Sequence, residues 1–200
     1  MTRTALKLNL FFLAFAAVFV NPRPTQAISN LESALPGITG SYQPAPGRMG
    51  SPLRGVHVEN VLDLPIVQQP ADQPYYVSDR NGEVTEFSMA DNYGSIGLLA
   101  HNTLSGKQFS QLAVGQTIHL IYQNGREDDF VVTQVLHFQA LQPDSISSSF
   151  RNLHEDETLT AAEMFNRAYV GGNRLVFQTC IAAEGNASWG RLFVIAMPRE

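Results

Sequence analysis

The chain has 200 residues, of which 44% are hydrophobic and 16% are charged, and its formal net charge at pH 7 is −5. This length suits one domain with flanking segments, and the acidic balance argues against a nucleic-acid-binding protein, which usually needs a basic face. The only cysteine is Cys180, so a disulfide framework within the chain is excluded and a hydrophobic core must hold the fold.

Residues 1–27 resemble a targeting segment. Arg3 and Lys7 give a positive start, residues 8–20 are apolar apart from one asparagine, and small residues stand in 25–27. An apolar run of about a dozen residues fits a signal peptide better than a spanning helix of about 20. We therefore predict a cleaved signal peptide, with an uncleaved signal anchor as the alternative. Either one places the domain outside the cytoplasm, secreted or tethered to a membrane through residues 8–20.

Prolines and glycines interrupt residues 28–55, which we interpret as a linker before a domain at 56–200. Within 56–67 the pattern fits a first strand or a short helical turn. The next β-prone runs, 75–77 and 83–87, flank an Asn-Gly pair that is typical of a hairpin turn.

Further β-prone runs follow at intervals typical of a sandwich or barrel. The expected strands are residues 96–101, 117–122, 130–138, 174–180 and 191–197, with an Asn124-Gly125 turn between the second and third of these. A helical turn or two is expected at 106–112. Thr160-Ala161-Ala162-Glu163 is a capping box that starts a helix through Tyr169, which Gly171-Gly172 ends. The fold class is therefore mainly β: a closed barrel with small peripheral helices.

Cys180 ends the apolar run 174–180 and is the first candidate for chemistry. A cysteine in an apolar run is more often a small core residue than a nucleophile. Gln178 and Thr179 beside it favour a strand that emerges from the core. A thiol becomes a nucleophile when nearby positive charge favours the thiolate, and His101 and Arg191 would supply that charge if the fold brings them close.

His101 stands apart from the other four histidines because it closes an apolar run and opens a polar loop that begins with Asn102. A strand that ends in this way delivers its last side chain into a cleft. His119 and His137 lie within predicted strands and are candidate cross-strand partners. No third ligand accompanies them at a convincing spacing, so no metal site is expected.

Arg191 opens the second apolar run, 191–197, after Trp189-Gly190. It is either a surface arginine paired with a carboxylate or a donor to a carbonyl that becomes an oxyanion during thiolate attack. The acidic clusters 127–129 and 155–157 lack the spaced ligands of a calcium loop, and we interpret both as solvated loops.

Taken together, these segments resemble the sortase family of exported cysteine transpeptidases. The resemblance rests on Leu99-Ala100-His101-Asn102 with Gly106 and Phe109, on 112–118, and on Thr179-Cys180 followed by Arg191 and its apolar strand. It covers roughly residues 60–197. Phe177 stands where the family usually has leucine, and the segment 140–172 is long.

The resemblance implies an eight-stranded β-barrel in which Cys180 attacks a peptide bond of a sorting motif in a secreted protein, often after threonine. It implies that His101 acts as acid and base, that Arg191 orients the substrate and stabilises the oxyanion, and that Thr179 and Asn102 bind substrate. An amine on the cell wall or a pilin would then resolve the thioester. No cofactor and no nucleic acid are expected.

Two alternative hypotheses for the function remain. L,D-transpeptidases also use Cys, His and Arg, but their histidine lies close before the cysteine in a compact Ser-x-Gly-Cys-like setting. Here His101 and Cys180 are 79 positions apart, and the residue directly before Cys180 is Thr179 instead of a glycine. The non-enzymatic alternative is a secreted β-barrel binding module in which Cys180 is a core residue.

Overall fold

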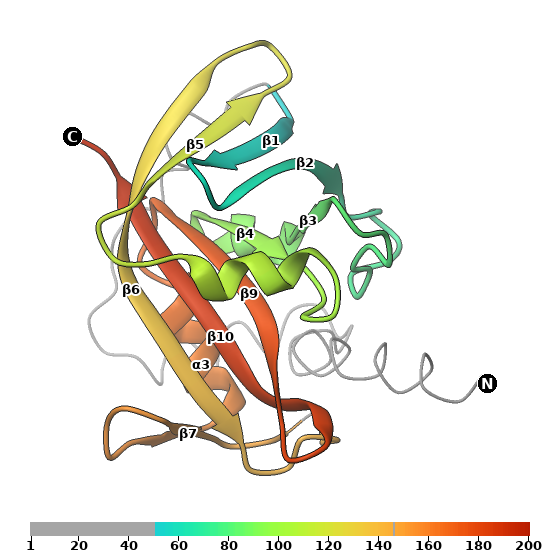
Figure 1. Ribbon diagram of the computed structural model, residues 1–200, viewed down its shortest axis with the longest axis vertical. Coiled ribbons are helices and arrows are strands. Elements are labelled where there is room, and N and C mark those ends of the chain that lie inside the picture. The colour runs from blue at the N-terminus through green and yellow to red at the C-terminus, as the bar shows by residue number, and fades with distance from the viewer. Residues whose placement is uncertain (1–50, 146) are drawn as a thin grey trace, which may run out of the picture.

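The computed structural model describes residues 51–145 and 147–200, and these residues form one mainly β unit with small helices (Figure 1). The predicted signal segment and most of the predicted linker lie outside the described residues. The first strand begins at Leu53, inside the range expected for the linker. The strands are β1 (Leu53–Val58), β2 (Leu62–Gln68), β3 (Val84–Glu86), β4 (Ser95–Leu99), β5 (Thr117–Tyr122), β6 (Glu127–Ala140), β7 (Phe150–Asn152), β8 (Thr158–Leu159), β9 (Arg174–Ala183) and β10 (Asn186–Pro198).

Eight of these strands close into a barrel, as predicted. The order is β10-β9-β4-β3-β2-β1-β5-β6, and β6 pairs again with β10, while β7 and β8 extend the sheet from β6. Most neighbours are antiparallel, but β2–β3 and β4–β9 are parallel. The parallel pair β4–β9 sends the ends of both strands to the same edge, which matters for the site below.

Apolar side chains from all eight strands fill the interior of the barrel. Because successive side chains of a strand point to opposite faces, every second residue enters this core. Representative members are Val56, Leu98, Ile118, Phe177 and Val194.

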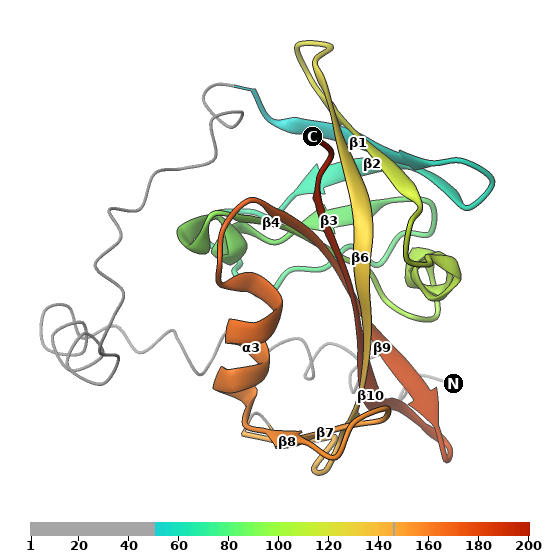
Figure 2. The ribbon, with the colours of Figure 1, turned by 90° about the vertical axis from the view of Figure 1, so that its left-hand side faces the viewer.

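A second apolar cluster lies on the outer face of the long strands β6, β9 and β10, beneath helix α3 (Ala161–Tyr169). Figure 2 shows α3 running alongside these strands. The helix buries Met164, Phe165, Ala168 and Tyr169, which lie on one side of a helix at 3.6 residues per turn. The alternate residues of β9 and β10, including Val176 and Phe193, meet it from below.

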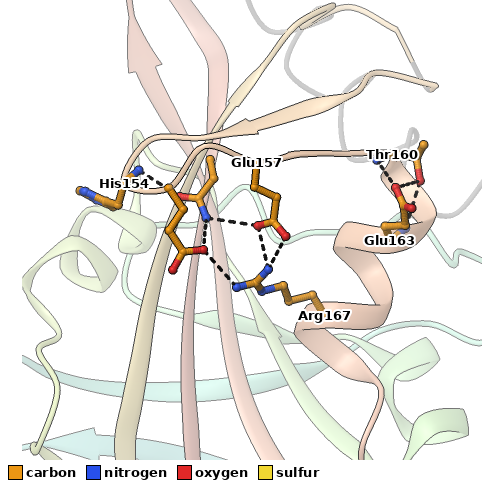
Figure 3. A network of polar contacts seen from close by, with 7 residues as sticks. His154, Glu157, Thr160, Glu163 and Arg167 are labelled. Atoms are coloured by element: carbon orange, nitrogen blue, oxygen red, sulfur yellow. Dashed lines mark hydrogen bonds and ion pairs between the residues drawn. The ribbon is translucent and has the colours of Figure 1, made fainter.

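The predicted start of this helix is confirmed. Thr160 caps it by accepting from the Glu163 amide at 3.2 Å, while the Glu163 carboxylate accepts from the Thr160 amide at 2.8 Å (Figure 3). Arg167, one helical turn further, donates to both oxygens of Glu157 at 2.7 Å. The side chain of Arg167 therefore fastens α3 to the loop that joins β7 and β8.

The two other helices are 3₁₀ turns, η1 (Ser88–Tyr93) and η2 (Ser105–Gln111), and the second matches the predicted helical turn. The predicted Asn124-Gly125 turn joins β5 and β6, with Gly125 at φ 84°. Within the described residues, no helix is both long enough and apolar enough to cross a membrane.

Three expectations are corrected by the structure. Residues 75–77 are not a strand and form no hairpin with 83–87, because β3 pairs in parallel with β2 and the Ser78 amide donates to the Thr85 side chain instead of to a strand ladder. His119 and His137 are not partners, since His119 pairs across the sheet with Asp129. Residues 127–129 belong to β6 instead of a loop.

Candidate active site

Cys180 and Arg191 face each other directly across two antiparallel strands. The register pairs Arg191 on β10 with Cys180 on β9. Side chains opposite each other in an antiparallel pair lie about 5 Å apart at Cβ and point to the same face. The two predicted site residues are therefore immediate neighbours.

His101 reaches the same position from the other side of β9. Strand β4 runs parallel to β9 with Leu99 opposite Gln178, and the Ala100 amide extends the ladder by donating to the Gln178 carbonyl at 3.3 Å. Two residues further along both chains stand His101 and Cys180. The structure thus brings His101, just after β4, Cys180 on β9 and Arg191 on β10 to adjacent positions, because β9 pairs with β4 on one side and with β10 on the other.

All three residues belong to the outer face of the barrel. Cys180 packs within the outer apolar cluster, together with Leu99 and Phe193, which stand two residues from His101 and Arg191 respectively. The site is also deeply covered: the exposed fractions are 5% for Cys180, 3% for His101 and 2% for Arg191. A buried, partly apolar setting strengthens every electrostatic interaction between these groups.

Arg191 brings a positive charge to the thiol. Its Nη1 donates to the carbonyl oxygens of Gly190 at 2.6 Å and Ser188 at 3.3 Å, which fixes the guanidinium within the β9–β10 hairpin. Burial lowers the pKa of Arg191 and the nearby Cys180 opposes this shift, but an arginine remains charged at neutral pH. A fixed cation at this position can stabilise negative charge that develops on a bound carbonyl oxygen.

His101 is tuned toward the neutral imidazole. Burial lowers the pKa of its ring, and a hydrogen bond to the Val77 backbone and the charge of Asp79 partly oppose that shift. A neutral imidazole can accept a proton at neutral pH, which is what a general base requires. Val77 and Asp79 lie in the loop between β2 and β3 and were not anticipated, because their relation to His101 depends on long-range packing.

Thr179 and Gly106 hold the end of β4 in place. The Thr179 hydroxyl donates to the Ala100 carbonyl at 2.8 Å, and the Gly106 amide donates to the His101 carbonyl at 3.0 Å. Thr179 precedes Cys180 in a strand, so its side chain points to the opposite face. This geometry gives Thr179 a positioning role, and the substrate contact predicted for it stays a prediction.

Asn102, the other predicted substrate-binding residue, links the His101 loop to the β9–β10 hairpin. Its Nδ2 donates to the Ala187 carbonyl at 2.9 Å. The loop is tied from the other side as well, where the Gly82 amide donates to the Ser105 hydroxyl at 2.9 Å. Contacts from three separate segments thus fix the chain around His101.

A small pocket lies next to the three residues, on the side of Leu99 and Gln178. Its lining residues are Gln69, Pro74, Tyr75, Val77, Phe87, Leu99 and Gln178. Gln178 stands two residues before Cys180 and Leu99 two residues before His101, so the pocket is one side-chain position along β4 and β9 from the candidate site, and none of the three site residues lines it. In residues 51–145 and 147–200, no group of three or more His, Cys, Asp or Glu side chains is arranged to hold a metal ion.

Comparison with known proteins identifies the architecture. No protein-family model and no curated protein matches the chain. Among solved structures, sortase C1 from Streptococcus suis is similar over 74% of this chain and 73% of its own, with a TM-score of 0.50 and 12% identity.

Two further solved structures have lower TM-scores. Sortase A from Listeria monocytogenes gives 0.47 at 11% identity, over 74% of this chain and 86% of its own. Sortase E1 from Streptomyces coelicolor, solved with a tripeptide in its active site, gives 0.46 at 17% identity, over 74% and 88%. On the closed barrel and the first of these likenesses, the fold of this chain is that of a sortase.

Proposed function

We propose that this protein is an exported cysteine transpeptidase of the sortase type, which cleaves a sorting motif in a secreted protein and transfers the acyl part to an amine. One observation carries the proposal: Cys180 is paired in register with Arg191, and His101 stands at the end of the adjacent parallel strand. A thiol, an imidazole and a guanidinium at neighbouring positions form a set suited to covalent catalysis.

In the first half-reaction, the Cys180 sulfur bonds to the carbonyl carbon of the scissile peptide while His101 accepts the thiol proton. The carbonyl electron pair moves onto oxygen, and the charge of Arg191 stabilises the resulting oxyanion. The carbon–nitrogen bond then breaks as His101 returns the proton to the leaving amine, which leaves a thioester on Cys180. The lowered pKa of His101 supports this route, because the imidazole starts neutral.

In the second half-reaction, an acceptor amine attacks the thioester while His101 takes its proton. The carbon–sulfur bond breaks, the proton returns to Cys180, and a new amide leaves the site. Water competes at high concentration, so transfer depends on an oriented amine, for which the effective molarity can be large. The small exposed fraction of Cys180 supports limited entry of water.

The location and partners form part of the same proposal. Residues 1–27 would direct export, the mature chain would begin near Ile28, and the substrate and the cell-wall or pilin amine would meet the enzyme at the cell surface. Mass spectrometry of the native protein tests this, because an intact N-terminus in a cytoplasmic fraction would contradict it.

The central test is acylation of Cys180. Peptides with a threonine before the scissile bond are mixed with the wild type and with Cys180→Ala, and the intact protein mass is measured with and without an added glycine peptide. We expect a thioester only in the wild type and a transfer product when the glycine peptide is present. Hydrolysed product alone, across all amines tried, would make the protein a cysteine peptidase.

A second function is favoured by one observation. Cys180 is only 5% exposed and packs in the outer apolar cluster, as a core cysteine of a binding module would. Reaction with a small methanethiosulfonate reagent in the folded protein separates the two. We expect labelling at a rate well above that of unfolding; labelling no faster than unfolding, with no thioester, would favour the binding module.

A further inference from the structure

Two histidines outside the candidate active site are in direct contact through their ring nitrogens. His137 lies on β6, and its partner is His154 in the loop between β7 and β8, instead of the His119 expected from the sequence. His154 Nε2 is 3.3 Å from His137 Nδ1, and the ring centroids are 5.2 Å apart with the ring planes at 82°. Two imidazole nitrogens this close can share either one proton or one metal ion.

The backbone on both sides of this pair is fixed by hydrogen bonds. The Leu153 amide donates to the His137 carbonyl at 2.9 Å, and the His154 amide donates to Asn152 Oδ1 at 3.0 Å. Asn152 is itself buried and lies opposite Phe138 in the β6–β7 pair. The protein therefore keeps the two imidazoles next to each other without help from a bound ligand.

The separation of the two nitrogens matches the spacing of two ligands on a zinc ion. Zinc binds histidine nitrogen at about 2.0–2.1 Å with tetrahedral geometry, which places two ligand atoms about 3.3 Å apart. An octahedral ion with the same bond length would need about 2.9 Å. The observed 3.3 Å between His137 and His154 thus fits the tetrahedral ion. Because His154 is exposed, a small rotation of its ring can direct both lone pairs to one point.

Both rings can present an unprotonated nitrogen at neutral pH. Burial and the neighbouring His154 lower the pKa of His137, so this ring is neutral. In the present contact one ring donates its N–H to the other, and the donating ring becomes a ligand when its proton moves to its second nitrogen. A protonated imidazole cannot bind a metal, so zinc binding at this pair should weaken below about pH 6.

The charges around the pair favour a cation. Residues 155–157 directly follow His154 and carry three carboxylates, and Arg167 forms ion pairs with two of them. Figure 3 shows the Arg167 guanidinium turned toward these carboxylates while the His154 side chain points away from it. The third carboxylate, Asp156, forms no ion pair within residues 51–145 and 147–200. Arg151 on β7 is exposed to solvent, which screens its charge.

We propose that His137 and His154 form a binding site for one zinc ion, with water molecules in the remaining positions of the tetrahedron. Magnesium and calcium, which prefer oxygen ligands, should not bind there. Arg167 fastens the loop of His154 to α3, so a zinc ion bound to β6 and this loop would add a cross-link between the sheet and the segment that holds the helix. Zinc binding does not depend on the proposed reaction, so either can fail without the other.

The experiment measures zinc binding by isothermal titration calorimetry on protein purified without a polyhistidine tag. Cys180→Ala serves as the background, because a thiol beside a histidine is itself a zinc ligand. His137→Gln and His154→Gln are made in this background. Thermal unfolding without zinc shows whether each variant keeps the fold, and titrations with magnesium and calcium test the choice of metal.

His57→Gln in the same background is the matched control. The His57 and His119 rings also lie side by side, with centroids 5.9 Å apart, but His119 Nδ1 contacts Asp129 at 2.8 Å instead of His57. The control removes one histidine of a neighbouring pair and leaves the proposed ligands in place.

We expect one zinc ion per chain and a melting temperature that rises with the zinc concentration. His137→Gln and His154→Gln should each weaken binding at least about tenfold, whereas His57→Gln should bind like the background. His154 is exposed, so His154→Gln keeps the test valid if His137→Gln does not fold. No heat of binding at millimolar zinc, an affinity unchanged by both variants, a loss confined to His57→Gln, or an equal response to magnesium would overturn the inference.

Discussion

A methyl group added at Gly106 should disturb the candidate site without touching its reactive atoms. A Cβ built there would overlap Thr179 Oγ1 and would lie 2.7 Å from the His101 carbonyl oxygen and 2.8 Å from the Ala100 carbonyl oxygen. The backbone of Gly106 does not require a positive φ, so the penalty is purely steric. Two of the three contacts are backbone atoms, which cannot turn aside as a flexible side chain would.

We therefore expect Gly106→Ala to destabilise the fold by about 1–3 kcal/mol, the usual range for overpacking. At about 2–4 °C per kcal/mol for a domain of this size, the melting temperature should fall by roughly 2–12 °C. The rate of Cys180 acylation should fall further than stability alone explains, because relief of the clash moves the His101 carbonyl and the Thr179 hydroxyl together. The substitution would therefore slow acylation by displacing the His101 imidazole.

The assay pairs thermal unfolding with thioester formation at a temperature where every variant is folded. Gly55→Ala is the matched control: a Cβ there meets only the Leu64 carbonyl oxygen at 3.5 Å, an ordinary contact, and Gly55 lies in β1 away from the site. We expect Gly55→Ala to match or slightly exceed the wild type in stability. If Gly106→Ala unfolds and reacts like Gly55→Ala, the close packing around His101 has been misjudged.

Four further outcomes are expected. Thr160→Ala removes the helix cap and should lower the free energy of unfolding by about 1 kcal/mol in urea titrations; no change would mean that the cap contributes nothing. Thr179→Val should slow acylation more than it lowers stability, since the bond to the Ala100 carbonyl is lost while volume is kept; equal rates would remove its positioning role. Arg191→Lys should abolish acylation, because lysine cannot reproduce the planar set of donors, and wild-type rates would exclude Arg191 from the mechanism. Folding lowers the pKa of His101 from its unfolded value of 6.5, so the free energy of unfolding should be highest above pH 6.5 and should decrease as the pH drops below 6.5. If the free energy of unfolding of His101→Gln decreases as steeply with falling pH as that of the wild type, this expectation is contradicted.

Elements with local causes were predictable from the sequence. The helix start at Thr160 follows from a capping box whose two hydrogen bonds join residues three apart. The turn at Asn124-Gly125 follows from the ease with which glycine adopts a positive φ. Neither depends on any distant part of the chain.

Elements that depend on distant pairing were harder to predict. Residues 75–77 have the composition of a strand, but the neighbouring place in the sheet is taken by β3 in parallel with β2. The side chain of Gln69 then fixes the backbone of 74–76 by two hydrogen bonds. No local sequence pattern predicts that a glutamine side chain, instead of a neighbouring strand, will accept the role of hydrogen-bonding this backbone.

The candidate site divides in the same way. His101, Cys180 and Arg191 could be named because each ends or opens an apolar run, and a family resemblance joined them. Val77 and Asp79, which influence the pKa of His101, come from a loop whose sequence gives no sign of its destination. The pairing of Gln178 with Tyr169 likewise depends on the way α3 packs, which spacing along the chain does not reveal.

The residues proposed to react lie on or next to the paired strands of the barrel, whereas the residues that surround them come largely from connecting segments. The barrel interior is closed by apolar side chains, so reactive groups can stand only on its outer face, and strand register alone sets Cys180 beside Arg191. Other segments pack over that face: α3 supplies Tyr169, and the loop between β2 and β3 supplies Gln69 and Val77. Because strand register is hard to alter and connecting segments tolerate change, a fold of this kind can keep its reactive set while the connections redefine which peptide fits. Variants in these connecting segments should accordingly change which peptide reacts, whereas variants of Cys180 and Arg191 should abolish acylation for every peptide alike.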